Sequence, residues 1–289
     1  MQLEGSIVAI VTPFADGRID EAAFRRLVDF QIENGTRGIV PCGTTGESAT
    51  LSHAEHAELV RLTVETVAGR GVVVAGTGSN STREALELTV AAKADGADAA
   101  LLITPYYNKP TQEGLYRHYR VIAEEVDLPL VVYNCPGRTG CSISPQTMAR
   151  LAELDNVVAV KDATGDLEWT TQVCAIEGLT VISGDDSLTL PQMSVGARGV
   201  ISVLANVAPR PMADLVGKAL AGDWEGARAL HHKYFALMKT LFIESNPIPV
   251  KAACEMMGLI GPEIRPPLTP LGEPNRARLR EVMQAVDLI

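Results

Sequence analysis

The stretch VVAVK at residues 157–161 is one of eight short runs that decide the fold class of this 289-residue chain. Each run is almost continuously apolar and rich in β-branched residues, which is typical of a parallel strand covered on both faces. The predicted strands are residues 7–11, 38–40, 72–75, 99–103, 130–133, 157–161, 181–183 and 199–203.

Helical patterns lie in the intervals between these runs, for example at residues 20–33, 53–67, 82–94 and 112–125. Eight strands that each precede a helix or a helix-sized interval predict an α/β fold, the (β/α)₈ TIM barrel. A doubly wound open sheet is the alternative. Periodicity alone does not exclude it, although open sheets usually have fewer strands.

After Pro211 only helical patterns follow, at residues 211–220, 223–242, 247–257 and 275–286, with Pro247 at the first position of its helix. A typical barrel needs about 250 residues. We therefore predict a barrel that carries the active site over residues 1–222 and a C-terminal helical domain over residues 223–289. Such helices often serve subunit packing, and a cap within a single chain is the alternative.

The composition argues against several classes of partner. The net charge is −10, and no run of Lys and Arg exceeds a pair, so nucleic acid and anionic membrane surfaces are poor partners. No apolar stretch approaches the ~20 residues of a membrane span, and Glu4 and the short run 7–11 do not make a signal peptide. Five cysteines without a CxxC pair indicate reduced thiols. We expect a soluble, cytoplasmic protein that binds neither nucleic acid nor membrane.

Polar residues gather where the predicted strands end, which is where the active site of a βα barrel forms. Three of the six tyrosines lie there. The residues at these strand ends are Gly43-Thr44-Thr45-Gly46-Glu47, Tyr106, Tyr107, Tyr133, Arg138, Lys161 and Gly184-Asp185-Asp186.

Lys161 ends an apolar strand, whereas the other six lysines lie in helical or loop sequence. An ammonium group in apolar surroundings loses solvation, so its pKa falls and the free amine becomes available. Such an amine attacks a ketone to form a Schiff base, which makes the substrate an electron sink for carbon–carbon chemistry. The alternatives are a lysine that extends into solvent and one that pairs with Asp162.

Tyr133 and the Thr44-Thr45 pair are the next candidates. Tyr133 ends the preceding strand, so it can face Lys161 and shuttle protons; a packing tyrosine is the alternative. Thr44 and Thr45 offer hydroxyl and backbone N–H groups that suit a carboxylate, although a plain strand–helix turn explains the flanking glycines equally well.

Phosphate and metal motifs are incomplete in this sequence. Residues 43–48 lack the Gly-Lys-Ser/Thr ending of a phosphate loop, and residues 76–78 lack the third glycine of the dinucleotide fingerprint. His53 and His56 do not form the HExxH zinc motif, so a surface helix face is the simpler interpretation. We predict no metal.

Taken together, six motifs in order resemble the dihydrodipicolinate synthase/N-acetylneuraminate lyase superfamily over essentially the whole chain. They are Gly43-Thr44-Thr45-Gly46-Glu47-Ser48, Tyr133-Asn134-Cys135-Pro136-Gly137-Arg138-Thr139-Gly140, Lys161-Asp162-Ala163-Thr164-Gly165, Gly184-Asp185-Asp186, Gly199-Val200-Ile201-Ser202-Val203 and Asn246-Pro247-Ile248-Pro249-Val250-Lys251.

The resemblance implies a class I aldolase-like lyase that needs no cofactor. Lys161 would form an imine with pyruvate, and Tyr133 would be the proton donor and acceptor. Thr44 and Tyr107 would link Tyr133 to solvent, with Tyr107 entering from a neighbouring subunit. The assembly implied is a homotetramer, a dimer of dimers. The substrate-binding residues it implies are Thr45, Arg138, Ile201, Gly184 and Asp185.

Arg138 distinguishes among the activities of the superfamily. A guanidinium can hold a second carboxylate bidentately, which suits L-aspartate-4-semialdehyde and hence lysine and diaminopimelate biosynthesis; a solvated loop arginine is the alternative. The rival functions are an N-acetylneuraminate or 2-keto-3-deoxy sugar-acid lyase, and a non-catalytic sensor of a keto acid or amino acid.

The resemblance also implies a feedback site for L-lysine, which revises the simpler interpretation of the two histidines. Its residues would be Ser48, Ala49, His53, His56, Asn80, Glu84 and Tyr106. Two positions depart from the family pattern: Asp162 stands where many relatives carry Glu, and Cys42 precedes the Gly-Thr-Thr turn. We expect Cys42 to confer sensitivity to thiol reagents.

Overall fold

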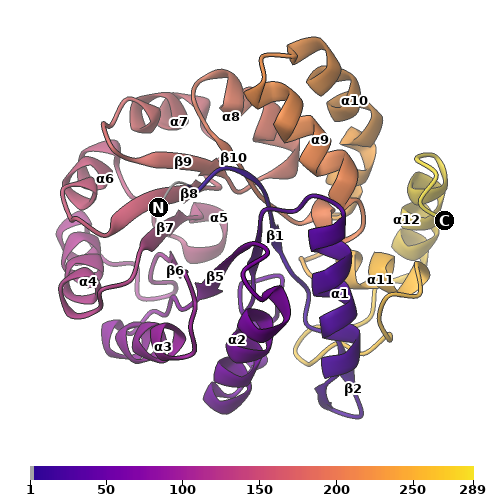
Figure 1. The fold of residues 1–289 in the computed structure, drawn as a ribbon, viewed down its shortest axis with the longest axis horizontal. Helices are drawn as coiled ribbons and strands as arrows, with labels where there is room; N and C mark the ends of the chain where they lie inside the picture. Colours follow the sequence, from indigo (N-terminus) through magenta and orange to yellow (C-terminus); the bar gives the residue numbers. More distant parts are fainter. Residues whose placement is uncertain (1–2) are drawn as a thin grey trace.

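A computed structural model describes residues 3–289, and in it eight parallel strands close into a barrel (Figure 1). The hydrogen-bonded order around the barrel is β1, β10, β9, β8, β7, β6, β5, β4. Because β1 pairs with both β10 and β4, the sheet has no edge and the open-sheet alternative is wrong. The strands are β1 (Gly5–Ala9), β4 (Gly38–Val40), β5 (Val72–Gly76), β6 (Ala99–Ile103), β7 (Leu130–Asn134), β8 (Val157–Asp162), β9 (Thr180–Ser183) and β10 (Gly199–Ser202).

All eight predicted strands are therefore confirmed. Each is buried on both faces, as the near-continuous apolar runs indicated. Alternate side chains divide between two clusters: Val131 and Ala159 pack inside the barrel, whereas Val132 and Val160 pack outward against the helices.

Helices surround the barrel and cover its outer face (Figure 1). Three helices begin and end at the predicted residues, 53–67, 82–94 and 112–125. Their starts are fixed by Ser52, Ser81 and Thr111, whose side chains each accept a hydrogen bond from a backbone N–H of the first turn. The surrounding helices are α1 (Glu21–Glu33), α2 (His53–Val67), α3 (Thr82–Ala94), α4 (Gln112–Glu125), α6 (Pro145–Ala152), α7 (Leu167–Cys174), α8 (Thr189–Ser194) and α9 (Pro209–Leu220).

The C-terminal part is helical, with α10 (Trp224–Thr240), α11 (Ile248–Met256) and α12 (Glu273–Gln284) beside one flank of the barrel (Figure 1). The placement of Pro247 as the first helical residue was wrong, since Pro247 is the N-cap and the helix begins at Ile248. Within residues 3–289 no helix is long and apolar enough to cross a bilayer.

Two short elements escaped the sequence patterns. One is a hairpin of two-residue strands, β2 (Phe14–Ala15) and β3 (Arg18–Ile19), and the other is the one-turn helix α5 (Pro136–Thr139). Both follow barrel strands on the side of the site, and α5 carries Arg138.

Candidate active site

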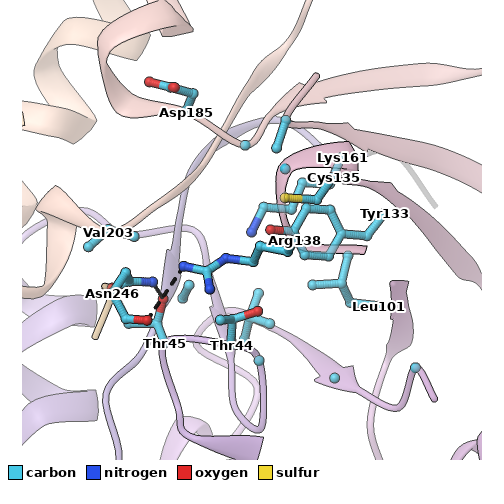
Figure 2. A pocket seen from close by; sticks show the side chains of 18 of the residues that line it. Thr44, Thr45, Leu101, Tyr133, Cys135, Arg138, Lys161, Asp185, Val203 and Asn246 are labelled. Carbon is cyan, nitrogen blue, oxygen red and sulfur yellow. Dashed lines mark hydrogen bonds between the residues drawn. The ribbon is translucent and has the colours of Figure 1, made fainter. Parts of the chain in front are cut away.

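A cavity of about 360 Å³ lies at the carboxyl-terminal end of the barrel strands, where we predicted the active site (Figure 2). It is open on one side and is lined by residues that end or follow the strands. Among them are Thr44, Thr45, Tyr133, Arg138, Lys161, Gly184 and Asp185.

Among the residues that the structure describes, Lys161 is the one lysine that lines this cavity. Its side chain projects into the barrel from β8, and the residue is only 6% exposed. Tyr133 is its register partner on β7, and the Lys161 Nζ lies 4.3 Å from the centroid of the phenol ring. The position on neighbouring strands therefore places amine and phenol in the same pocket (Figure 2).

Both structural alternatives for Lys161 are contradicted. Its burial excludes a side chain that extends into solvent. The carboxylate of Asp162 faces the outer side, where it accepts hydrogen bonds from Thr164, Thr170 and Gln192. Among residues 3–289, the ion pairs do not include Lys161.

Desolvation prepares this amine for nucleophilic chemistry. Burial lowers the pKa of Lys161 to about 8, with Cys135 and Asp186 acting in the opposite direction. The neutral amine is thus present in quantity slightly above neutral pH, where an exposed lysine remains an ammonium ion.

Tyr133 stays protonated over the same pH range. Burial raises the pKa of its phenol far above the ordinary value, and a hydrogen bond with the Thr44 side chain opposes that shift. A neutral phenol between an amine and a threonine hydroxyl can pass a proton in either direction.

The turn that follows β4 supplies Thr44 and Thr45. It is bounded by two non-glycine residues with left-handed backbone, Cys42 (φ 55°) and Glu47 (φ 57°). The turn also needs glycine on the neighbouring strand, because a Cβ on Gly76 would lie 2.3 Å from the Cys42 carbonyl oxygen. The Oγ1 of Thr45 accepts a hydrogen bond of 2.9 Å from Nδ2 of Asn246.

The remaining predicted substrate residues are placed in three different ways. Arg138 is exposed at the mouth, and its guanidinium is 3.4 Å from the Asn246 carbonyl oxygen (Figure 2). Gly184 borders Lys161, since a Cβ there would lie 3.1 Å from the Lys161 Cε. Asp185 lines the cavity, but its carboxylate points away and accepts 2.8 Å hydrogen bonds from Ser187 (Figure 2).

Two predicted site residues lie outside the lining of the cavity. Ile201 on β10 is inside the barrel and 1% exposed. Tyr107 is 89% exposed with a left-handed backbone (φ 73°), so within this chain it does not reach the cavity.

The structure adds residues that sequence reasoning left without a role. Asn246 lines the cavity and bridges Thr45 and Arg138, and Cys135 lies beside Tyr133 (Figure 2). Asp186 is fully buried, and its carboxylate accepts hydrogen bonds from Ser202 and from the N–H groups of Val203 and Leu204. All three lie in motifs quoted above, but nothing in those motifs indicates which side chains point inward.

Burial argues against the expected thiol sensitivity of Cys42, which stays a prediction because this residue lines the cavity. Cys42 is 2% exposed, and burial raises the pKa of its thiol far above the ordinary value. A thiol that stays protonated and shielded is a poor nucleophile.

A second cavity, of about 510 Å³, adjoins the first and shares Thr44, Gly76 and Arg138 with it. Six of the seven residues proposed for lysine line it, namely Ser48, Ala49, His53, His56, Glu84 and Tyr106. The seventh, Asn80, is outside the lining, and its carbonyl oxygen accepts a hydrogen bond from Asn108.

The two histidines of this cavity differ. His53 is exposed and lies 3.0 Å from the Glu84 carboxylate, whereas His56 is 5% exposed and lies 2.7 Å from the Gly76 carbonyl oxygen. Placing both on a surface helix face was therefore wrong for His56. Within residues 3–289 no group of three or more His, Cys, Asp or Glu side chains is arranged to hold a metal ion.

The chain is thus a (β/α)₈ barrel whose cavity holds a lysine that faces a tyrosine and has no ion-pair partner among the described residues. Residues 2–286 match the dihydrodipicolinate synthetase family, and the chain belongs to this family. The 4-hydroxy-tetrahydrodipicolinate synthase of Pelobacter propionicus is 55% identical over 288 residues, 99% of each chain.

Solved structures agree with this assignment. The chloride-inhibited dihydrodipicolinate synthase from Acinetobacter baumannii, complexed with pyruvate, is 52% identical and superposes with a TM-score of 0.98 over 100% of both chains. The enzyme from Cyanidioschyzon merolae with lysine bound is 40% identical, with a TM-score of 0.96 over 99% of both chains.

Asp186→Asn should lower the pKa of Lys161 below about 8, because the ionised carboxylate favours the ammonium form. Burial raises the pKa of Asp186 itself to about 6, so the effect requires a pH above that value. Competitive labelling with acetic anhydride across pH, read by mass spectrometry, measures the Lys161 pKa. Asp185→Asn is the matched control and should leave the Lys161 pKa in place; an unchanged or higher pKa in Asp186→Asn contradicts this account.

Proposed function

We propose that this enzyme condenses pyruvate with L-aspartate-4-semialdehyde to form 4-hydroxy-tetrahydrodipicolinate, in the biosynthesis of lysine and diaminopimelate. The observation that carries the proposal is the unpaired, desolvated amine of Lys161 facing the protonated phenol of Tyr133. Family membership supports the same reaction.

The first stage builds a carbon nucleophile from pyruvate. The Lys161 amine attacks the ketone carbon, the C–N bond forms, and water leaves as the imine appears. Tyr133 donates and recovers the protons of this step, and the N–H and hydroxyl groups of Thr44 and Thr45 receive the pyruvate carboxylate. Loss of a methyl proton then gives the enamine.

In the second stage the enamine carbon attacks the aldehyde carbon of the semialdehyde, and the carbonyl oxygen takes up a proton. The amino group of the new chain then attacks the imine carbon. The ring C–N bond forms as the bond to the Lys161 nitrogen breaks, which frees the enzyme. Each bond is made by the substrates and Lys161, so the proposed reaction needs no metal or organic cofactor.

The proton path is completed by a second copy of the chain in this proposal. Tyr107 projects from the surface, and its own cavity lacks it. We place it in the cavity of a neighbouring subunit, beside Thr44 and Tyr133, within a homotetramer built as a dimer of dimers. The exposed ring and the left-handed backbone at Tyr107 and Lys109 support an interface role for this segment.

Charge and location complete the proposal. The net charge of −10 supports a protein without nucleic-acid or membrane partners. The five cysteines are all free, which supports a reducing compartment such as the cytoplasm. We treat residues 1–222 as the catalytic barrel and residues 223–289 as a helical domain packed on its flank.

Incubation with pyruvate followed by borohydride should attach the reduced adduct to Lys161, because the trapped imine becomes a stable amine. Peptide mass spectrometry locates the adduct. Its initial rate should rise with pH through about 8, since the lowered pKa of Lys161 leaves neutral amine available above that value. Lys93→Met, at the surface, should label normally and Lys161→Met should not; labelling elsewhere, or none, overturns the mechanism.

Arg138→Met should reduce kcat/KM for L-aspartate-4-semialdehyde by roughly 100-fold, because about 3 kcal/mol of charge-assisted bonding to a carboxylate is lost. Steady-state assays of condensation measure this, and pyruvate trapping on Lys161 serves as the internal control and should persist. Faster turnover of N-acetylneuraminate or a 2-keto-3-deoxy sugar acid by the unmodified enzyme would favour the sugar-acid lyase instead.

We further propose that the second cavity binds L-lysine as a feedback inhibitor. Glu84 is suited to the ammonium group, since hydrogen bonds from Ser79 and His53 hold its pKa low and keep it ionised. Millimolar L-lysine should slow the reaction, and Glu84→Gln should weaken inhibition about 10-fold or more through loss of one charge-assisted contact. The control variant Glu87→Gln, changed on the exposed face of the same helix, should be inhibited as strongly as the unmodified enzyme. If millimolar L-lysine leaves the rate of the unmodified enzyme unchanged, the proposed lysine site is wrong.

A further inference from the structure

One buried ion pair lies outside the catalytic cavity and has no role in the reaction just described. Lys251 on α11 contacts the Glu47 carboxylate, and the two side chains are 5% and 1% exposed. They are 204 residues apart in the chain. The pair therefore joins the turn after β4 to the C-terminal helices.

A gain in folding stability does not by itself explain why this ion pair is buried. Removing two charges from water is costly, and buried ion pairs are often matched or exceeded in stability by apolar residues of similar volume. Burial lowers the pKa of Lys251 even with Glu47 beside it, so desolvation outweighs the attraction for this amine. Stability alone therefore does not account for this pair.

The pair lies at the end of the catalytic turn. Glu47 ends the turn in a left-handed conformation, and its second carboxylate oxygen accepts a 3.1 Å hydrogen bond from the N–H of Arg265. The preceding residue, Gly46, accepts a 2.8 Å hydrogen bond at its carbonyl oxygen from the Thr12 hydroxyl. Thr45 accepts a 2.9 Å hydrogen bond at its hydroxyl oxygen from the Asn246 side chain. Three successive residues are thus fixed by groups outside the turn.

The surroundings make this junction rigid. The ring of Phe14, in the N-terminal hairpin, lies 4.5 Å from the Lys251 Nζ and 4.1 Å from the Arg265 Cζ, measured to the ring centroid. Arg265 also pairs with Glu55, at 2.6 Å, near the start of α2. The segment that carries Thr44 and Thr45 is consequently held at its C-terminal end by groups from three other parts of the chain.

We propose that Glu47 and Lys251 are positioning residues for the reaction: their ion pair holds the Thr44-Thr45 turn against Tyr133 and Lys161, so that one side chain of α11 acts on the site from outside the cavity. This inference rests on the proposed function. The pair acts through Thr44: the Glu47 N–H donates a 3.1 Å hydrogen bond to the Thr44 carbonyl oxygen, and Thr44 lines the same cavity as Tyr133 and Lys161. Its loss should slow proton transfer while leaving the Lys161 amine intact.

The test compares Glu47→Gln, Lys251→Met and the double variant Glu47→Gln/Lys251→Met. Lys251→Met alone leaves a buried carboxylate unpaired and should lower the thermal midpoint, whereas the double variant removes both charges and should recover it. In all three variants kcat should fall at least 10-fold while KM for pyruvate changes less than about 3-fold, as expected for lost proton transfer. Borohydride trapping should still label Lys161.

A matched control is the half-buried pair Arg276–Glu255, which joins α12 to α11 without touching the turn. Glu255→Gln/Arg276→Met should keep kcat unchanged. The proposal is overturned if the double variant recovers kcat together with its thermal midpoint, or if kcat falls only in proportion to folded protein. Absence of a pyruvate adduct in the unmodified enzyme would instead refute the proposed function, so the two failures are distinguishable.

Discussion

An amine without a counter-ion inside a closed barrel is the constraint on which the rest of this structure depends. Lys161 points inward because side chains alternate along a strand, so Ala159 shares its face and Val160 packs outward. Barrel closure removes most of the solvent from that face. Burial is then the chief cause of the lowered Lys161 pKa, so the fold itself favours the neutral amine.

The carboxylates nearest in sequence and in space are kept from neutralising this amine. Asp162 follows Lys161 in the chain, but the strand turns it to the outer face, where neutral donors occupy its oxygens. Asp186 acts on Lys161 through its charge, while its own hydrogen bonds go to Ser202 and to backbone N–H groups. The Lys161 pKa therefore reflects a balance between desolvation, which lowers it, and the electrostatic effects of Cys135 and Asp186, which raise it, with no direct ion pair to any described residue.

Much of this arrangement follows from sequence because it is local. A strand buried on both faces must be apolar throughout, and helix ends were predictable where Ser52 or Thr111 caps the first turn. Long-range contacts have no such signal. Sequence reasoning did not find that Asn246 would meet Thr45, or that Lys251 would meet Glu47 across 204 residues. Asp185 and Asp186 are adjacent, and only the 3-10 turn after β9 decides which carboxylate is buried.

The two cavities share a wall, and this has a thermodynamic consequence. Thr44, Gly76 and Arg138 line both, while His56 contacts the Gly76 carbonyl oxygen from the second cavity. Gly76 packs closely against the turn, since a Cβ on it would lie 2.3 Å from the Cys42 carbonyl oxygen. A ligand that shifts this wall from one side must alter binding on the other, and linkage requires the effect to be reciprocal. Because Glu47 also lines the second cavity while Thr44 lines both, a single turn of the chain contacts both cavities.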